Sequence, residues 1–387
     1  MPPPDKNTSV FVEGDFSRKE RKDCKAGGST SVSATIDRSG WKRVRLGEAL
    51  TNVGWCNYSH LQPRQVRKVT QGDDTGEVSI TTDYYHPASP VVLFGDHTCN
   101  VKYVDFDCLI LGDGVKLLTP NHEVFSTRFL YYLVQYVASK VPQGYARHLA
   151  VLKKTECALP CYEDQFKIAN AITSIDTHIS ALQALIAKYE AIKKATVNLL
   201  LKQKADWRQI SLGDIGDVLM CKRILKNQTT ETGDVPFYKI GTFGRTPDSF
   251  ISRSLFKDFK ARFSYPKKGD VLLSAAGTIG RTVVFNGEDA YFQDSNIVWI
   301  DNDERAVTNR FLNVLYGQMN WQTENGGTVS RLYNANIRNT KIKIPSLSEQ
   351  KRIVAILDSI DGTINGLKSQ LAKAQDIKQG MMSYFFG

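Results

Sequence analysis

The chain of 387 residues contains the same ordered set of motifs twice. Each set opens with Trp-x4-Leu-Gly and an acidic residue, at Trp41 and again at Trp207, an offset of 166 residues. Each set later contains Pro-x4-Gln-x2-Ile, at Pro160 and again at Pro345, an offset of 185 residues. The repeat therefore predicts two structural units of one plan rather than unrelated domains.

A long helix is predicted after each Pro-x4-Gln motif, because the match continues through Ser-Ile-Asp and a heptad pattern of apolar residues. These apolar residues are Ile168, Ile172, Ile175, Ile179, Leu182, Ile186, Tyr189 and Ile192, and in the second copy Ile353, Leu357, Ile360, Ile364, Leu367, Leu371, Ala374 and Ile377. A helix of ~33 residues spans about 50 Å, more than one small domain covers. We expect the two helices to pair as an antiparallel coiled coil with pseudo-twofold symmetry. The alternative is two separate helices, each packed on its own domain.

Between the opening motif and the helix, each copy contains short β-like runs broken by Gly, Asp, Asn and Pro. One amphipathic helix is expected in each, near residues 127–139 and 308–320. The predicted class is α+β, with two mixed α/β bodies joined by the two helices. The expected boundaries are a disordered polar tail at 1–40, a first body at 41–160, a first helical region at 161–206, a second body at 207–345 and a second helical region at 346–387.

The charge of the chain favours a polyanionic partner. Fifty Lys and Arg against forty Asp and Glu give a net charge of +10 and a pI near 9.1, which suits nucleic acid. The N-terminal sequence MPPPDKNTSV has no apolar stretch of the kind that a secretory signal needs, and no run approaches the ~18 apolar residues of a membrane helix. Seven cysteines, an odd number, favour reduced thiols and a cytoplasmic location.

The second body contains glycine-rich loops that carry cations, hydroxyls and amides. Small residues let backbone N–H groups approach a phosphate, while Arg pairs with phosphate or guanine, and amides suit base edges. The candidate DNA-contacting residues are Lys239, Gly241, Thr242, Arg245, Ser274, Gly277, Thr278, Arg281, Gln293, Ser295, Asn296, Ser330 and Arg331. Tight turns between strands are the alternative interpretation of each loop.

The first body offers a shorter set of candidates, and each of its glycine loops fits a hairpin turn equally well. They are Gly95, Asp96, His97, Lys102, Asp113, Lys116, Arg147 and His148. In both copies a cation, Arg147 or Arg331, follows glycine shortly before the hinge proline, as suits a DNA-backbone contact, and the alternative is that each ends a helix. Residues 50–90 contain nothing like the run from Val235 to Gly241, so the base-reading residues of this body are less defined.

Enzyme motifs are missing from the sequence. It contains no Walker A pattern, no Gly-x-Ser-x-Gly and no His-Glu-x-x-His. Glu349-Gln-Lys351 resembles the end of a metal-dependent nuclease motif, but its counterpart Asp164-Gln-Phe166 lacks the lysine. We therefore expect no catalytic residue, no metal and no cofactor in the chain itself.

Together these motifs resemble the specificity (S) subunit of type I restriction-modification systems. The repeated Pro-x4-Gln-x2-Ile with its heptad helix is similar to the two conserved regions of that family, and the Trp-x4-Leu-Gly openings to its target-recognition-domain starts. Gly269–Ser274, Gly277–Arg281 and Gln293–Asn296 resemble one common type of recognition domain, and Phe94–His97 and Gly112–Gly114 another.

The resemblance implies a non-catalytic subunit with two target-recognition domains, each reading one half of a bipartite double-stranded DNA site. The helix pair would set the spacer and dock two methyltransferase (M) subunits, which carry S-adenosylmethionine, and ATP-driven motor-nuclease (R) subunits would join them for cleavage. The alternatives are a coiled-coil scaffold without DNA recognition and a self-contained DNA nuclease.

Overall fold

A computed structural model of the chain describes residues 38–54, 64–72, 77–80, 89–112, 114–141, 147–202, 206–321 and 331–387. The chain divides into two compact units, of which unit 1 is Met1–Ser180 with Ala372–Gly387 and unit 2 is Ala181–Leu371. Most of the polar tail predicted at 1–40 lies outside the described residues. The units are described separately below.

The repeated opening motif has the same structural role in both units. In unit 1, β1 (Lys42–Arg45) pairs antiparallel with β9 (Glu156–Leu159), the strand that leads to the hinge proline. In unit 2, β10 (Arg208–Ser211) pairs antiparallel with β18 (Lys341–Ile344). The ladder joins the two ends of each body at the start of its long helix.

The glycine of the opening motif is explained by close packing. The motif continues into a 3₁₀ turn, η1 (Leu46–Ala49), which packs against α2 (Leu149–Lys154). A Cβ atom on Gly47 would lie 2.8 Å from the carbonyl oxygen of Lys153, so only glycine fits there. The equivalent turn in unit 2, η2 (Leu212–Asp214), packs against α6 (Asn334–Asn339).

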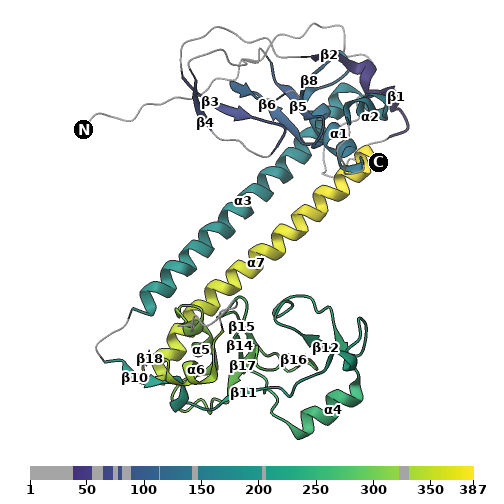
Figure 1. The fold of residues 1–387 in the computed structure, drawn as a ribbon. Coiled ribbons are helices and arrows are strands. Elements are labelled where there is room, and N and C mark those ends of the chain that lie inside the picture. The colour runs from purple at the N-terminus through teal and green to yellow at the C-terminus, as the bar shows by residue number, and fades with distance from the viewer. Residues whose placement is uncertain are drawn as a thin grey trace, which may run out of the picture. The chain divides into compact units, whose positions relative to one another are not determined.

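Each body contains a four-stranded antiparallel sheet with the same strand order. In unit 1 the order is β2 (Leu50–Gly54), β8 (Val115–Pro120), β5 (Val91–Gly95), β6 (Val101–Val104). In unit 2 it is β11 (Val218–Met220), β17 (Ile297–Ile300), β14 (Val271–Ser274), β15 (Thr282–Val284). The central strands β5 and β14 are buried along their whole length, and the sheets are labelled in Figure 1.

Each body also contains a three-stranded sheet. The orders are β4 (Glu77–Ile80), β3 (Arg64–Val69), β7 (Cys108–Ile110), and β13 (Phe250–Ile251), β12 (Val235–Tyr238), β16 (Tyr291–Phe292). In both sheets the middle strand pairs antiparallel with the first strand and parallel with the last. Residues 50–90 contain no sequence run like that at Val235, yet they contain the strand β3, which has the pairing pattern of β12. Strand pairing uses backbone groups, so β3 takes the place of β12 without sharing its residues.

One helix packs on each four-stranded sheet. In unit 1, α1 (Thr127–Lys140) packs on β5, β6 and β8, and in unit 2, α5 (Asn309–Tyr316) packs on β14 and β15. Ser126 and Thr308 cap these helices, since each hydroxyl accepts a hydrogen bond from the third helical N–H. A further helix of unit 2, α4 (Arg253–Arg262), buries Phe256 in the core beneath β12 and β16.

Two long helices follow the Pro-x4-Gln motifs, as the heptad pattern predicts. They are α3 (Tyr162–Leu200) and α7 (Leu347–Phe386), with 39 and 40 residues. Together with the sheets they confirm the α+β class. None of the helices in the described part of the chain combines the length and apolar character needed to cross a membrane.

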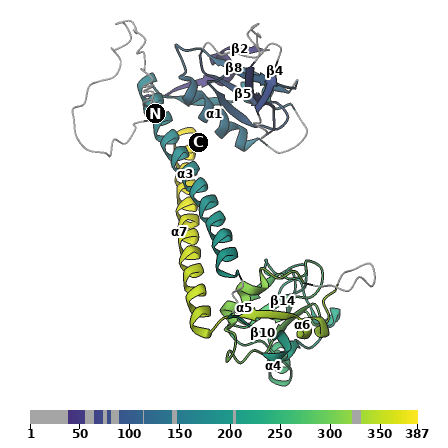
Figure 2. The ribbon, with the colours of Figure 1, turned by 90° about the vertical axis from the view of Figure 1, so that its left-hand side faces the viewer.

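Within each unit, a segment of α3 packs beside a segment of α7. In unit 1 the end of α7 lies beside the first half of α3 (Figure 2), and Met382 joins the core around Ile168 and Ile172. In unit 2, Val197 of α3 belongs to the core that holds Ile353 and Leu357 of α7. The apolar heptad positions therefore pack between helix segments as well as against the bodies.

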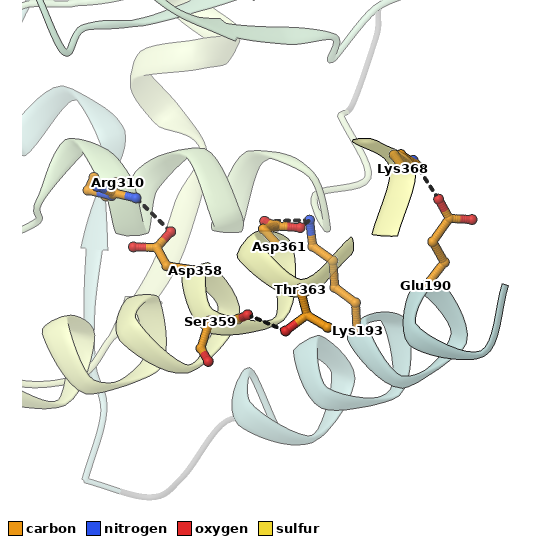
Figure 3. A network of polar contacts seen from close by, with 8 residues as sticks. All are labelled: Glu190, Lys193, Arg310, Asp358, Ser359, Asp361, Thr363 and Lys368. Atoms are coloured by element: carbon orange, nitrogen blue, oxygen red, sulfur yellow. Dashed lines mark hydrogen bonds and ion pairs between the residues drawn. The ribbon is translucent and has the colours of Figure 1, made fainter. Parts of the chain in front are cut away.

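Ion pairs between the two helices involve the repeated motif residues. In unit 2, Lys193 Nζ lies 2.6 Å from Asp361 Oδ1 and Lys368 Nζ lies 2.8 Å from Glu190 Oε1, so the segments run antiparallel (Figure 3). In unit 1, Lys378 Nζ lies 2.7 Å from Asp176 Oδ1. Lys193 and Lys378 are equivalent in the repeat, as are Asp176 and Asp361, so the same pair forms twice with the helices exchanged.

Candidate nucleic-acid interface

A groove of about 1070 Å³ in unit 2 collects residues from two of the predicted loops. Four of the predicted residues line it, namely Lys239, Gln293, Ser295 and Asn296. The strands β12 and β16 end at these two loops, which brings segments far apart in sequence together. Sequence reasoning predicted the loops but could not predict which of their residues share a surface.

The first loop, which follows β12, is a turn stabilised by its own side chains. The Thr242 hydroxyl accepts a hydrogen bond from the Lys239 N–H at 3.1 Å, and Lys239 Nζ lies 2.9 Å from Asp248 Oδ1. Arg245 at the end of this loop is exposed, and its N–H donates to the carbonyl oxygen of Thr242 at 2.9 Å. Its side chain forms no ion pair or hydrogen bond with the part of the chain that the structure describes. Thr242 therefore shapes the loop, while Arg245 offers a free cation.

The second loop, which follows β14, is closed by Ser274. Its hydroxyl donates to the carbonyl oxygen of Thr278 at 2.6 Å and accepts from the N–H of Arg281 at 2.9 Å. Gly280 has a φ of +87°, and a Cβ there would lie 2.7 Å from Cδ1 of Trp321. The glycine is therefore required by the turn and by the indole that covers it.

Two side chains tie the loops to one another. Arg281 Nη1 donates to the carbonyl oxygen of Phe243 at 3.0 Å, which joins the second loop to the first. Gln293 Oε1 accepts from the N–H of Ile240 at 2.9 Å, which joins the third loop, residues 293–296 after β16, to the first. Arg281 was predicted as a direct DNA contact, and the structure gives it a structural bond within the loop cluster.

Arg331 lies beside the third loop. Its Nη2 donates to the carbonyl oxygen of Ser295 at 3.1 Å, and its backbone forms a bridge with Ala276. Ser295 has a φ of +53°, so the chain bends sharply where this bond forms. The predicted contact Ser330 lies outside the described residues.

Sequence reasoning missed two cations of the groove, Arg223 and Lys226, which are both exposed. Arg223 Nε lies 2.8 Å from Asp294 Oδ2, so it is held at the third loop. The signal in the sequence was the pair Lys222-Arg223 directly after β11, at the same edge as the other loops. Beneath it, burial raises the pKa of the Cys221 thiol to about 12, so this thiol is a neutral core group.

In unit 1 several predicted residues are engaged in the fold. Asp96 is only 5% exposed, and its Oδ1 accepts from the N–H of Leu149 at 2.8 Å at the start of α2. Lys102 Nζ donates to the carbonyl oxygens of Thr70, at 2.9 Å, and of Gly72. These bonds fix neighbouring loops of the first body, which explains the polar residues there without a ligand.

The other candidates of unit 1 differ in exposure. Arg147 is exposed, His97 and Lys116 are half-buried, and His148 is buried. Asp113 lies outside the described residues. Gly95 ends β5, and its N–H donates to the carbonyl oxygen of Asn100 at 2.8 Å, which closes the loop that contains Asp96 and His97.

Backbone hydrogen bonds make the loops of the two bodies equivalent. The bond from Gly95 N–H to Asn100 matches that from Ser274 N–H to Arg281, at 2.8 and 2.9 Å. The bonds from Asp96 to Gly114 and from Ala275 to Asn296 also match, both at 2.7 Å. Those from Leu111 to Val69 and from Gln293 to Tyr238 match as well, both at 2.9 Å. The loop frame is thus shared although the sequences differ.

The same register aligns side chains that the sequence could not align. His148 N–H donates to Asp96 and Leu332 N–H donates to Ala275, so Arg147 corresponds to Arg331. Asn100 corresponds to Arg281, and its Nδ2 donates to the carbonyl oxygen of Gln71 at 3.0 Å, as Arg281 does to Phe243. Each body therefore has an arginine at the same position, Arg147 or Arg331. Each also uses one side chain, Asn100 or Arg281, to join the loop after β5 or β14 to the loop after β3 or β12.

No group of three or more His, Cys, Asp or Glu residues in the described ranges lies close enough to hold a metal ion. The acidic group with a shifted pKa near the sheets is Asp270. Burial raises the pKa of this carboxyl, whose Oδ2 accepts from the N–H of Lys267 at 2.7 Å. It caps a turn at the end of β14 opposite to the loops.

Comparison with known proteins agrees with this geometry. Residues 204–374 match the family model of the type I restriction modification DNA specificity domain. The chain is 52% identical over 198 residues to a putative type I restriction enzyme specificity subunit from Haemophilus influenzae, a match that covers 51% of this chain and 50% of that protein. The match thus spans about half the length of that relative.

More distant matches cover more of the chain. The EcoR124I/EcoR124II specificity subunit of Escherichia coli is 23% identical over 332 residues, which cover 78% of this chain and 80% of that protein. The crystal structure of a type I restriction-modification S subunit from M. genitalium has a TM-score of 0.60 at 13% identity, covering 92% and 98%. A chain from a structural study of type I R-M complex assembly has a TM-score of 0.51 at 18% identity, covering 89% and 97%.

The two structural matches show the fold alone, and the sequence matches show which proteins the chain is similar to. Both relatives are described as specificity subunits, as the repeated motifs predicted. Residues 204–374 are therefore similar to the type I restriction modification DNA specificity domain, and the chain is similar to proteins described as type I specificity subunits.

Proposed function

We propose that the chain is the sequence-specific DNA-binding subunit of a type I restriction-modification complex, and that each body reads one half of a bipartite site. The observation that carries this proposal is the shared loop frame, in which two bodies of different sequence hold equivalent loops by equivalent hydrogen bonds. Two domains that recognise different base sequences need the same loop backbone with different side chains.

The equivalent positions separate phosphate contacts from base contacts. Arg147 and Arg331 are cations in both bodies, which suits a phosphate contact that carries no sequence information. Gln293 corresponds to Leu111 and Asn296 to Gly114, so these positions differ in the groups that they offer to a base edge. We infer that the second body selects bases through Gln293, Ser295 and Asn296.

The long helices would hold the two bodies at a fixed separation. We infer that α3 and α7 pair along their length as an antiparallel coiled coil, because the Asp–Lys pair forms in each unit with the helices exchanged. Two readers of the major groove are conveniently about one DNA turn apart, roughly 34 Å. A helix of 39 residues at about 1.5 Å per residue is long enough for that.

The remaining assignments follow from the proposed role. The target-recognition domains would be residues 41–160 and 207–345, and the conserved helical regions 161–206 and 346–387. The helical regions would dock methyltransferase subunits carrying S-adenosylmethionine, with motor-nuclease subunits joining for cleavage. In this scheme the chain itself is non-catalytic, and a role on cellular DNA would place it in the cytoplasm.

Co-expression tests the proposal directly. The chain is expressed with and without its methyltransferase subunit, and adenine methylation is mapped across the host DNA. We expect methylation at one bipartite motif only when both are present. Methylation without the chain, or metal-dependent DNA cleavage by the chain alone, would contradict the proposal.

Arg245→Ala is expected to weaken binding of specific and random DNA by a similar factor. The exposed side chain has the character of a phosphate contact, and losing one such contact lowers the slope of log K against log salt by about 0.9. The measurement is a salt titration of DNA affinity by fluorescence anisotropy. Lys194→Ala, the same charge change at an exposed position of α3, is the control. An unchanged slope for Arg245→Ala would exclude it as a contact.

A further inference from the structure

A fully buried glutamine lies at the first turn of α7 in unit 2. Gln350 is 0% exposed, and its amide group makes three hydrogen bonds. Its Oε1 accepts from the N–H of Thr308 at 2.9 Å, while its Nε2 donates to the carbonyl oxygens of Ala306 at 2.9 Å and Pro345 at 3.0 Å. The side chain therefore joins the hinge proline, the long helix and the start of α5.

Unit 1 contains the same arrangement around Gln165, which is 1% exposed. Its Oε1 accepts from the N–H of Ser126 at 2.9 Å, and its Nε2 donates to the carbonyl oxygens of Val124 at 2.8 Å and Pro160 at 3.2 Å. Each of the three partners is the repeat equivalent of its counterpart in unit 2. Two independent copies of one bonding pattern show that the pattern belongs to the motif.

The chemistry of the pocket requires glutamine. Its partners are one N–H donor and two carbonyl acceptors, so the side chain must both accept and donate. An ionised glutamate accepts only, and methionine or leucine does neither. Since buried polar groups are normally hydrogen-bonded, replacing the amide leaves a helix-cap N–H and two carbonyls to find other partners.

The glutamine connects the long helix to the helix that supports the reading loops. Ser126 and Thr308 are the N-cap residues of α1 and α5, which pack on the sheets that carry the loops. A second polar contact between these helices differs in the two units. In unit 1, Tyr132 Oη of α1 lies 3.0 Å from Thr173 Oγ1 of α3. In unit 2, Arg310 Nη2 of α5 donates to Asp358 Oδ1 of α7 at 2.6 Å (Figure 3). Among the polar contacts described here, the glutamine is thus the one that both units share.

We propose that Gln165 and Gln350 are positioning residues that fix the direction of each long helix against its recognition body, and so make the protein selective for one spacer length. This inference rests on the proposed function. A spacer longer by one base pair moves one half-site by about 3.4 Å and rotates it by roughly a tenth of a turn. A rigid junction rejects such a site, whereas a loosened junction accommodates it.

The test measures how well the full complex with its methyltransferase discriminates between spacers. The probes are duplexes with both half-sites separated by the native spacer or by one base pair more or fewer. The variants are Gln350→Met, which keeps the size but removes all three bonds, and Gln350→Glu, which keeps the acceptor. Gln165→Met and Gln165→Glu are the matched pair in the other unit, and Arg310→Ala removes the second contact of α5 while leaving Gln350 in place.

We expect the methionine variants to lower discrimination against the altered spacers by roughly tenfold, the effect of one or two lost hydrogen bonds, and the glutamate variants to lose less. Arg310→Ala should keep most of the discrimination. If the variants weaken binding of all spacers by one common factor, or only fail to assemble, the glutamines are structural and the inference is overturned. If the wild-type complex recognises no bipartite site, the proposed function itself has failed, which is a separate result.

Discussion

Insertion of one heptad into α3 alone, after Leu185, is expected to abolish methylation of the native DNA site. Seventeen residues separate Asp176 from Lys193, and seventeen separate Asp361 from Lys378. Both Asp–Lys pairs can therefore form at once only if the segment from Asp to Lys has the same length in α3 as in α7. Seven added residues lengthen α3 by about 10.5 Å, which breaks this match.

The matched control inserts the same heptad into both helices, after Leu185 and after Gln370, the equivalent position of α7. A heptad preserves the phase of the apolar seam, so the two pairs can form again. Complex formation, measured by size-exclusion chromatography, should return, and any methylated site should have a spacer longer by up to about three base pairs at 3.4 Å each. A single insertion that leaves the methylated motif unchanged would refute the role of the helices in spacing.

The second large effect is expected for Arg281→Ala, which should weaken specific DNA binding by roughly 10- to 100-fold. Arg281 is half-buried and donates to the carbonyl oxygen of Phe243, so its loss frees two loops of the second body from each other. A hydrogen bond from a charged group contributes about 1.5–3 kcal/mol. Because the arginine acts on loop geometry, binding to random DNA should weaken much less.

Asn100→Ala in the first body is the matched variant, since Asn100 makes the equivalent bond to the Gln71 carbonyl oxygen. The bond is neutral and should contribute about 0.5–1.5 kcal/mol, so a smaller loss of specific affinity is expected. Both variants are titrated with the cognate duplex and a random duplex at one salt concentration. Unchanged affinity of Arg281→Ala for both duplexes would exclude any role of this residue in DNA binding.

Several features of the site were not accessible from the sequence. Arg281 was predicted as a direct contact because arginine after two glycines suits phosphate, but its partner Phe243 is 38 residues away in sequence. Asp96 was predicted as a contact because it follows a glycine in a loop, and the structure buries it at the start of α2. In both cases the deciding partner is distant in sequence, so no local pattern reveals it.

The first body was the least predictable part of the chain. Its strand β3 shares no motif with β12, although both occupy the middle of the three-stranded sheet. Its loops align with those of the second body only through backbone hydrogen bonds. The correspondence of Arg147 with Arg331 was suggested by a glycine and a cation before each hinge proline, and the hydrogen-bond register places the two residues at the same position.

By itself, the sequence determined the duplicated frame: the opening motif, the two long helices, the Pro-x4-Gln hinge and the class of the fold. These elements depend on residues close together in the chain, whose spacing is visible and is repeated. The tertiary structure alone decided which loops meet, which polar side chains are used within the fold and how the two bodies correspond. Strand pairing uses backbone groups that every residue except proline offers in full, so β3 and β12 have equivalent places without a shared pattern of side chains.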